Sequence, residues 1–211
     1  YDLAVTVTEA TGSGSFNIVG DTLVSYSGTE STVTIPDGVR VIGENAFKNN
    51  DYILNVICPD SLEEIGYRAF HDCDNLQSVS LPETLKVINE GAFYYCENLK
   101  TLGHTDDGVL PKGLTSIGVK AFYFCKALEG DLVIPEGVSS LSAGIFYNAF
   151  ALTSITIPDT VTSMDANGDQ FANCTAVTSV TLSKNLAELP KTAFFTCKSL
   201  KALPDLSNVT S

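Results

Sequence analysis

The segment with the most chemically active side chains is short and polar: Gly103-His104-Thr105-Asp106-Asp107-Gly108. His104, Asp106 and Asp107 could ligate a cation, but a metal site needs three or four convergent ligands, which this segment does not supply by itself. Asp-Asp-Gly is equally typical of a turn. We therefore predict a surface loop and no metal, and we keep these three residues as candidate contacts for a partner.

A cysteine beside a histidine could act as a nucleophile, because a nearby imidazole activates the thiolate. Cys73 lies two residues after His71. Four further cysteines take the same place in the pattern described below without a histidine: Cys96, Cys125, Cys174 and Cys197. This recurrence predicts free, buried thiols packed as small hydrophobes, with disulfides between stacked neighbours as the alternative. Since G-x-S-x-G, H-E-x-x-H, P-loop and G-x-G-x-x-G motifs are also missing from the sequence, we predict no enzyme and no cofactor.

Charge and hydropathy exclude two kinds of partner. The chain has 12 basic and 25 acidic residues and a net charge of -13, without the basic stripe that a phosphate backbone requires. No apolar run approaches the roughly 20 residues needed to cross a bilayer. We therefore expect neither nucleic acid nor an anionic membrane as a partner, and no membrane insertion in this segment. Basic protein surfaces, neutral glycans and calcium remain open.

Two ladders of residues recur along nearly the whole chain with one shared period. A proline anchor, replaced by serine in the last repeat, stands at Pro36, Pro59, Pro82, Pro111, Pro135, Pro158 and Ser183. A phenylalanine stands at Phe47, Phe70, Phe93, Phe122, Phe146, Phe171 and Phe194. By subtraction, successive phenylalanines are 23, 23, 29, 24, 25 and 23 residues apart. Such a period indicates a solenoid, in which each repeat buries its apolar face against its neighbours.

One repeat illustrates how a coil of this solenoid should be built. Residues 76–81 alternate as a strand does and end at Pro82, which lacks the donor needed to continue a ladder. Leu85, Ile88 and Phe93 follow at roughly helical or 3₁₀ spacing. We predict an α/β solenoid: a right-handed superhelix of about seven 23-residue coils, with a short parallel sheet on one face.

The N-terminal residues do not fit the repeat. Residues 16–19 and 22–26 flank Gly20-Asp21, which is typical of a β-hairpin with a two-residue turn. A solenoid end exposes apolar core and open strand edges, so it needs a cap. A period of 20–29 residues with L-x-x-L-x-L is the signature of leucine-rich repeats. We therefore divide the chain into an N-terminal β-hairpin cap at 1–31, leucine-rich repeats at 32–202, and a partial final repeat or tail at 203–211.

The repeat resembles the BspA-like leucine-rich repeats. The first copy is formed by Ile35, Pro36, Val39, Ile42, Gly43, Ala46 and Phe47, and Phe-x-x-Cys-x-x-Leu completes the pattern. The resemblance covers about residues 22–203 and implies a bacterial surface or secreted protein of a family implicated in adhesion to host matrix proteins and to other cells. It predicts an extracellular or cell-surface binding module for proteins, with a glycan as a further candidate partner. The alternative is a structural stalk or spacer for other domains.

Aromatic residues directly after the core phenylalanine are the candidate binding site. Tyr94, Tyr123 and Tyr147 follow it immediately, and Tyr95 and Phe124 come one residue later. The first two repeats hold Lys48, Asn49, His71 and Asp72 in these places, so the fold does not demand an aromatic residue there. A tyrosine cluster suits an apolar, hydrogen-bonding interface. The alternative is that these rings pack against neighbouring coils on the convex side.

Two other surfaces are weaker candidates. Acidic residues follow the proline anchor in five repeats: Asp37, Asp60, Glu83, Glu136 and Asp159. Stacked coils would bring them about 5 Å apart, which favours a cation or a cationic partner, although acidic residues also suit a turn after proline. The outward strand positions are rich in serine and threonine, which suit any exposed sheet. Solenoids typically bind along their concave face.

Overall fold

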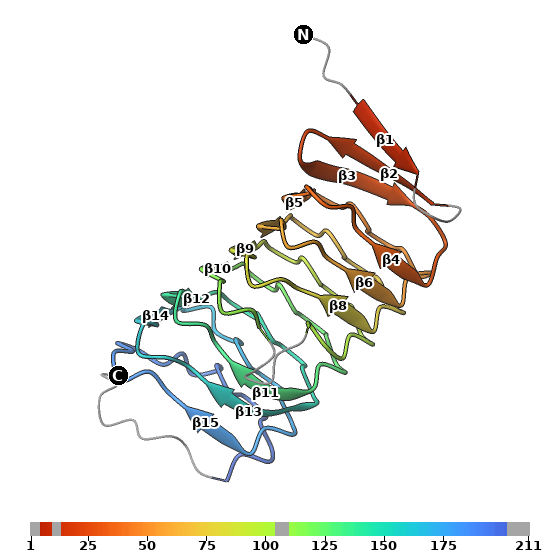
Figure 1. Cartoon of the computed structure of the whole chain (residues 1–211). Coiled ribbons are helices and arrows are strands. Elements are labelled where there is room, and N and C mark those ends of the chain that lie inside the picture. The colour runs from red at the N-terminus through yellow and green to blue at the C-terminus, as the bar shows by residue number, and fades with distance from the viewer. Residues whose placement is uncertain (1–4, 10–13, 104–109, 202–211) are drawn as a thin grey trace.

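The chain winds into a β-solenoid of about seven stacked coils, as Figure 1 shows. The computed structural model describes residues 5–9, 14–103 and 110–201. A typical coil passes through a first short strand, a proline turn, a second short strand and a series of turns that leads to the next coil.

The first strands stack in parallel along one face, as the sequence predicts. They are β4 (Thr32–Thr34), β6 (Asn55–Ile57) and β8 (Ser78–Ser80), followed by β11 (Gly130–Val133), β13 (Leu152–Thr156) and β15 (Ser179–Thr181). The register pairs Val33 with Val56 and Val56 with Val79. These three side chains are buried, so the alternation of the strand directs one residue inward and its neighbours outward.

A second parallel ladder runs along the opposite side of the coils, whereas the sequence predicted a sheet on one face only. It contains β5 (Val41–Ile42), β7 (Glu64–Ile65), β9 (Val87–Ile88) and β10 (Ser116–Ile117), and then β12 (Ser140–Leu141) and β14 (Ser163–Met164). Each of these strands has only two residues. A segment of two residues is too short to show the alternation of inward and outward side chains that indicates a strand. The spacing of its inward residue therefore fitted a helix equally well.

The helical part of the predicted α/β fold is wrong for the described residues, which contain no α- or 3₁₀-helix. The residues expected to be helical form consecutive turns, such as those closed by Tyr94 N–H to Gly91 C=O at 3.0 Å and Cys96 N–H to Phe93 C=O at 3.2 Å. Between the turns the backbone enters the left-handed region, with φ of 60° at Gly91 and 61° at Tyr95. A helix cannot propagate through such residues.

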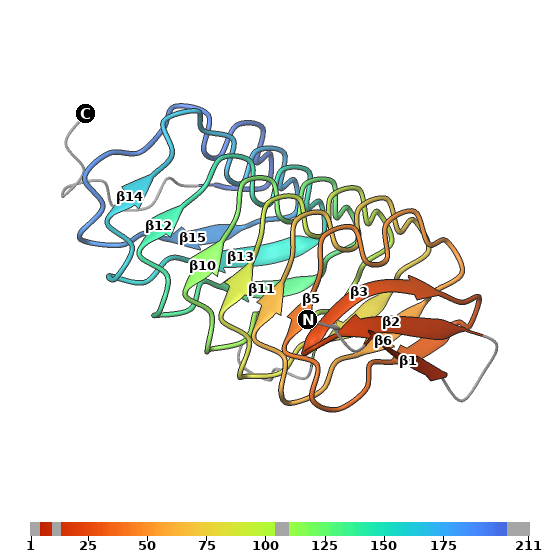
Figure 2. The ribbon, with the colours of Figure 1, turned by 90° about the horizontal axis from the view of Figure 1, so that it is seen from above.

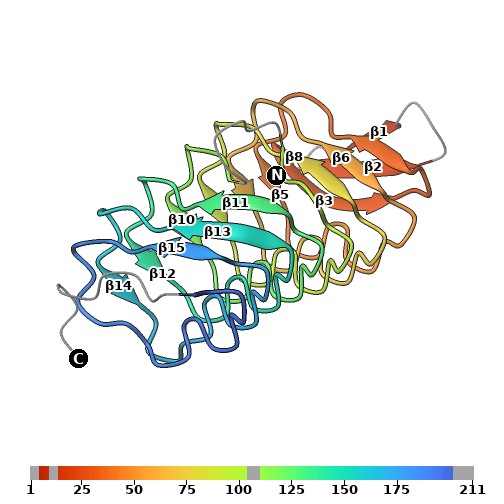
Figure 3. The same ribbon diagram turned by 90° about the horizontal axis from the view of Figure 1, so that it is seen from below.

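These turn segments stack into a continuous row, which we call the turn row and which corresponds to residues 43–52 of the first coil. Figures 2 and 3 show it as the wavy edge of the solenoid. N–H groups that a helix would use internally bond instead to the next coil, as from Phe93 to Ala121 and from Tyr95 to Tyr123, both at 2.8 Å. No helix of the described residues could span a membrane.

The phenylalanine ladder forms one column through the core, which confirms the stacking of equivalent positions. From Phe47 to Phe194 successive ring centroids are 4.8 to 5.9 Å apart, and the ring planes lie within 9° of each other. The first six rings are almost fully buried. The column therefore supplies both apolar burial and ring–ring contact at every level of the solenoid.

The cysteines are free and buried, as predicted. Each recurrent thiol donates a hydrogen bond to the carbonyl of the core phenylalanine one coil earlier, for example Cys96 Sγ to Phe70 O at 2.9 Å and Cys125 Sγ to Phe93 O at 3.2 Å. The same contact is made by Cys73, Cys174 and Cys197. The thiol therefore satisfies a carbonyl between coils, in addition to packing as a small apolar group.

Burial should make these thiols unreactive. It raises the pKa of Cys58 to about 12 and that of Cys125 and Cys174 further above the ordinary value, and only the thiolate reacts. We expect Ellman's reagent at pH 8 to label almost none of the six cysteines in the folded protein and all of them in guanidinium. Rapid labelling of two or more thiols in the folded protein would contradict the buried column.

The same shift has a consequence for stability at high pH. Above about pH 9 the unfolded chain releases thiol protons that the folded chain retains. Because the folded pKa values are raised, the thiols stabilise the fold fully below that pH, and the stability should fall as the pH rises from about 9 toward 12. Urea midpoints measured between pH 7 and 11 would test this direction.

The predicted hairpin is present at the N-terminal end. β2 (Ser15–Val19) and β3 (Thr22–Ser27) are antiparallel, β1 (Val5–Glu9) pairs with β2, and β3 pairs in parallel with β5. The rings of Phe16 and Tyr26 continue the phenylalanine column, with centroids 4.9 Å apart and Tyr26 5.3 Å from Phe47. The hairpin therefore places aromatic side chains against the first coil.

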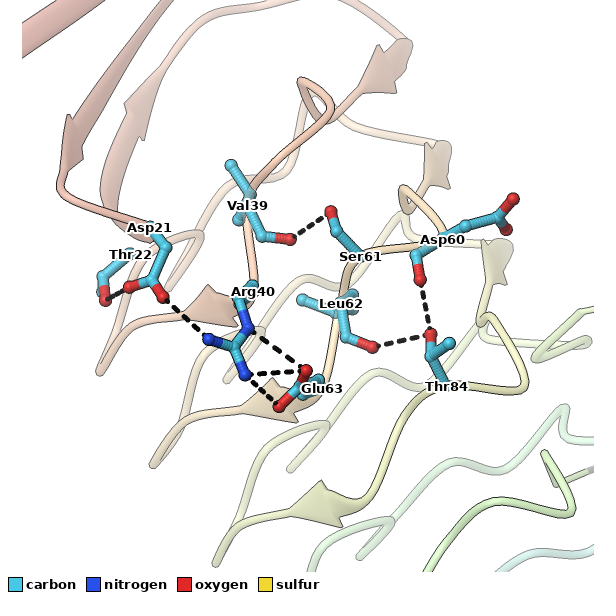
Figure 4. A network of polar contacts seen from close by, with 9 residues as sticks. All are labelled: Asp21, Thr22, Val39, Arg40, Asp60, Ser61, Leu62, Glu63 and Thr84. Carbon is cyan, nitrogen blue, oxygen red and sulfur yellow. Dashed lines mark hydrogen bonds and ion pairs between the residues drawn. The ribbon is translucent and has the colours of Figure 1, made fainter.

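Polar side chains attach this hairpin to the first coils (Figure 4). The guanidinium of Arg40 donates to both carboxylate oxygens of Glu63, with its Nη2 2.8 Å from each, and lies 3.7 Å from the carboxylate of Asp21 in the hairpin turn. Further on, the hydroxyl of Ser61 donates to Val39 O, and that of Thr84 donates to Leu62 O. These contacts give the side chains beside the proline turns a structural role.

The second ladder is interrupted between the fourth and fifth coils. In the first ladder, the described residues of the fourth coil contribute a bridge between Thr101 and Ser78, and the next described strand is β11. The second stops at β10 and resumes at β12. The fourth coil is also the one that contains the inserted residues 103–108. The turn row continues through this level, since Phe122 N–H bonds to Ile145 O at 2.9 Å.

Candidate functional site

The five predicted aromatic residues lie together on the turn row of the third, fourth and fifth coils. We call Tyr94, Tyr95, Tyr123, Phe124 and Tyr147 the aromatic cluster. In each of these coils the core phenylalanine lies between consecutive turns, which are closed by hydrogen bonds of 3.0 to 3.3 Å. These turns hold the phenylalanine side chain inward and the side chain of the next residue outward. The stacked turns then bring equivalent residues into contact.

The rings of the cluster stack in two parallel columns. In the first, Tyr94, Tyr123 and Tyr147 follow His71, with centroids 4.8 to 5.0 Å apart and planes within 12° of each other. In the second, Tyr95 lies 4.6 Å from Phe124 at 16°. Tilted contacts join the two columns, including Tyr94 to Tyr95 at 4.8 Å and Tyr123 to Phe124 at 4.9 Å.

All five side chains of the cluster are half-buried. They pack against neighbouring coils, as the structural interpretation of the sequence expected, and they also retain exposed surface, as a binding patch requires. Burial raises the pKa of the Tyr94 and Tyr123 hydroxyls above its ordinary value, so both remain protonated donors at neutral pH.

Two members of the cluster occupy backbone positions that disfavour aromatic residues. Tyr95 has a φ of 61° and Phe124 a φ of 64°, in the left-handed region that bulky side chains avoid. The equivalent residues of the other coils are also left-handed and are mostly asparagine or aspartate: Asn49, Asp72, Asn148, Asn173 and Thr196. Asparagine and aspartate tolerate this conformation best after glycine. Small polar residues are therefore sufficient for the fold at this position of the coil.

Charged side chains of both signs border the cluster, and the carboxylates of Asp72 and Asp169 act on Tyr94 and Tyr123. The Lys120 ammonium lies 5.2 Å from the ring centroid of Tyr123, and the Lys126 ammonium lies 5.4 Å from that of Phe124. Lys126 is paired with Glu97 at 2.7 Å. No carboxylate of the described residues lies within ion-pair distance of Lys120.

Two exposed phenylalanines of the turn row lie outside the site predicted from the sequence. Phe150 is 37% exposed in the fifth coil, at the place that holds Glu97 and Lys126 in the two preceding coils. Phe195 is 63% exposed in the last described coil, where it continues the positions of Tyr123 and Tyr147. An exposed phenylalanine at a place that is charged in other repeats was the available signal for Phe150.

The other predicted contacts, His104, Asp106 and Asp107, lie outside the described residues. The described residues on either side of this segment, Leu102 and Leu110, are buried in the core. Among residues 5–9, 14–103 and 110–201, no group of three histidine, cysteine or acidic side chains could hold a metal ion.

The acidic residues after the proline anchor make structural contacts in two coils. A Glu83 carboxylate oxygen accepts from the Lys112 N–H at 2.7 Å, and an Asp159 carboxylate oxygen accepts from the Lys184 N–H at 2.9 Å. Because each bond joins consecutive coils, these carboxylates close proline turns rather than forming an open acidic row.

The outward face of the first ladder is polar and internally bonded. Ser78 donates to Asn55 at 2.7 Å, and Thr153 and Ser154 both donate to Asp131, at 2.6 and 2.7 Å. These bonds lower the pKa of the Asp131 carboxyl. Exposed Ile57 and Val133 interrupt the polar face singly, and isolated apolar residues are normal on a surface. The aromatic cluster therefore remains the strongest candidate site.

Comparisons with known proteins agree with this architecture. The family model described as the BspA type leucine rich repeat region matches residues 17–107 and 104–211, in six copies. The crystal structure of the T. pallidum leucine rich repeat protein (TpLRR) is 27% identical, with a TM-score of 0.69 over 85% of this chain and 82% of that one. The pneumococcal vaccine antigen PcpA is 22% identical, with a TM-score of 0.63 over 85% of this chain and 44% of that one, a likeness that shows the fold alone. No curated protein sequence matches.

Proposed function

The chain belongs to the BspA-type leucine-rich repeat family, and from this premise we propose that it is a binding module of the cell surface or the secreted space, which holds a partner protein on the aromatic cluster. The solenoid supplies a rigid frame and no chemistry of its own.

The observation that carries the proposal is the left-handed backbone at Tyr95 and Phe124. A non-glycine residue in this conformation costs about 1–2 kcal/mol, and asparagine or aspartate tolerates it better than an aromatic residue does. Strained positions of this kind concentrate at functional sites. Aromatic residues that the fold does not need, on one exposed surface, match the composition of protein interfaces.

A stalk or spacer, the alternative function, does not account for this placement. A spacer requires only that coils stack, and the coils with Asn49, Asp72 and Asn148 at the same position stack equally well. We therefore favour binding over spacing.

The test replaces the strained pair in a Tyr95→Asn, Phe124→Asn double variant. Binding to immobilised extracellular matrix proteins should weaken at least about tenfold, since truncated aromatic anchors typically cost 2 kcal/mol or more. The free energy of unfolding should change by no more than about 1 kcal/mol, because relief of backbone strain offsets lost stacking.

Exposed aromatic residues away from the cluster provide the control. Tyr52→Asn removes a 63% exposed ring from the first coil and should leave binding unchanged. If the double variant binds as well as the wild type, the aromatic cluster is not the site. If it loses more than about 2 kcal/mol of stability, the rings serve mainly as core.

A further inference from the structure

The stacking of the cluster determines which part of each ring a partner can touch. Both faces of Tyr94 are covered, by His71 and Tyr123, and both faces of Tyr123 are covered, by Tyr94 and Tyr147. Phe124 has Tyr95 over one side and the Lys126 ammonium 5.4 Å from its ring centroid. A partner therefore meets ring edges and hydroxyl groups, and the faces of these rings are already occupied.

Covered faces disfavour a carbohydrate. A sugar ring packs on an aromatic side chain by laying its C–H groups, which are slightly positive, on the negative face of the ring. For Tyr94 and Tyr123 both faces are already used by the rings of neighbouring coils, and the ring edge is itself positive. The exposed edges of these rings instead attract groups with negative character.

The hydrogen-bond donors at the cluster have the same preference. The tyrosine hydroxyls can donate, and the pKa of the Tyr94 and Tyr123 hydroxyls is raised, so they stay protonated. Lys120 adds three donors beside Tyr123 and has no carboxylate partner among the described residues. At physiological salt, charges are screened beyond about 8 Å, so the groups beside the cluster decide its preference. The carboxylates of Asp72 and Asp169 act on Tyr94 and Tyr123, and Lys120 is a cation there without an ion-pair partner among the described residues.

We infer that the aromatic cluster recognises a polypeptide segment, not a glycan, in which apolar side chains flank an aspartate or glutamate. The apolar groups would pack on the ring edges, while the carboxylate and backbone carbonyls would accept hydrogen bonds from the tyrosine hydroxyls and from Lys120. This inference rests on the proposed function and specifies the chemistry of the partner at the same site.

The test selects ligands without assuming their chemistry. A phage-displayed library of random 12-residue peptides is panned on the wild-type protein, and cellohexaose, chitohexaose and maltohexaose are titrated by calorimetry. Selected peptides should be enriched in Asp or Glu next to Leu, Ile, Val or Pro. Their affinity should fall at least about tenfold in the Tyr95→Asn, Phe124→Asn variant, and none of the sugars should bind in a way that this variant abolishes.

Lys120 gives a second, independent readout. Lys120→Asn removes the charge and places at φ 54° a residue that accepts this conformation. It should weaken the selected peptides about three- to tenfold by removing one charge-assisted contact. Lys100→Asn, on an exposed lysine of the first ladder side, is the matched control and should have no effect.

The possible failures are distinguishable. If peptides or sugars bind the wild type and the double variant equally, the proposed site is wrong. If a sugar loses binding in the double variant, if the selected peptides are basic, or if no peptide depends on the cluster, the inferred chemistry is wrong. If the selected peptides bind the Lys120→Asn variant as tightly as the wild type, their carboxylate does not contact Lys120, and the inference is overturned.

Discussion

Phe122→Ala should destabilise the protein by about 3–5 kcal/mol. The ring is fully buried in the fourth coil and stacks on Phe93 at 5.2 Å and on Phe146 at 5.0 Å. Its removal leaves a cavity in the middle of the column and eliminates two ring contacts, each worth about 0.5–1.5 kcal/mol beyond burial. Urea unfolding followed by far-ultraviolet circular dichroism would measure the loss.

The matched control removes a phenylalanine from the surface. Phe195 follows a core phenylalanine of the column but is 63% exposed, so Phe195→Ala should change the stability by less than about 0.5 kcal/mol. A loss below about 1 kcal/mol for Phe122→Ala would mean that the solenoid is not held together by its phenylalanine column.

Leu23→Asp should detach the N-terminal hairpin and cost about 3–5 kcal/mol, because it places an unpaired carboxylate in an apolar interior. Leu23 lies on β3 with no exposed surface, and it is paired in register with Ile42 of the first coil. Without the hairpin, the strand edge of β5 and the ring of Phe47 would face water, so we also expect association of the variant at high concentration. Urea unfolding and light scattering would measure the two effects.

The adjacent residue offers the control for this change. Val24 is next in the same strand, points outward and is 40% exposed. Val24→Asp introduces the same charge on the solvent side and should cost less than about 1 kcal/mol. If both variants lost the same free energy of unfolding, the Leu23 side of β3 would not be the side that packs on the first coil.

The sequence was sufficient to predict the features that repeat at every coil. The phenylalanine column, the free thiols, the parallel stacking of first strands and the hairpin followed from residue type and spacing. The hydrogen bond from each thiol to a phenylalanine carbonyl was not predictable, because it depends on the distance between two coils. The second ladder was missed because two residues are too short a segment to show alternation.

The absence of helix in the turn row could have been recognised. Asn49, Asp72, Asn148 and Asn173 recur two residues after the core phenylalanine, and Asn45, Gly91 and Gly144 recur two residues before it. Asparagine, aspartate and glycine at fixed positions are typical of left-handed backbone, which ends a helix. In the same pattern Tyr95 and Phe124 are exceptions, because they stand where other repeats have asparagine or aspartate. The stacking of the aromatic rings could not be predicted from the sequence, because it depends on the distance between neighbouring coils.

The break in the second ladder has a mechanical consequence. Between the fourth and fifth coils this ladder is interrupted from β10 to β12, while the phenylalanine column and the turn row cross the same level intact. Under tension or shear such a rod flexes first at this level, pivoting about the edge that remains bonded. The aromatic cluster spans that pivot, so a load on the rod would leave the distances within the cluster almost unchanged.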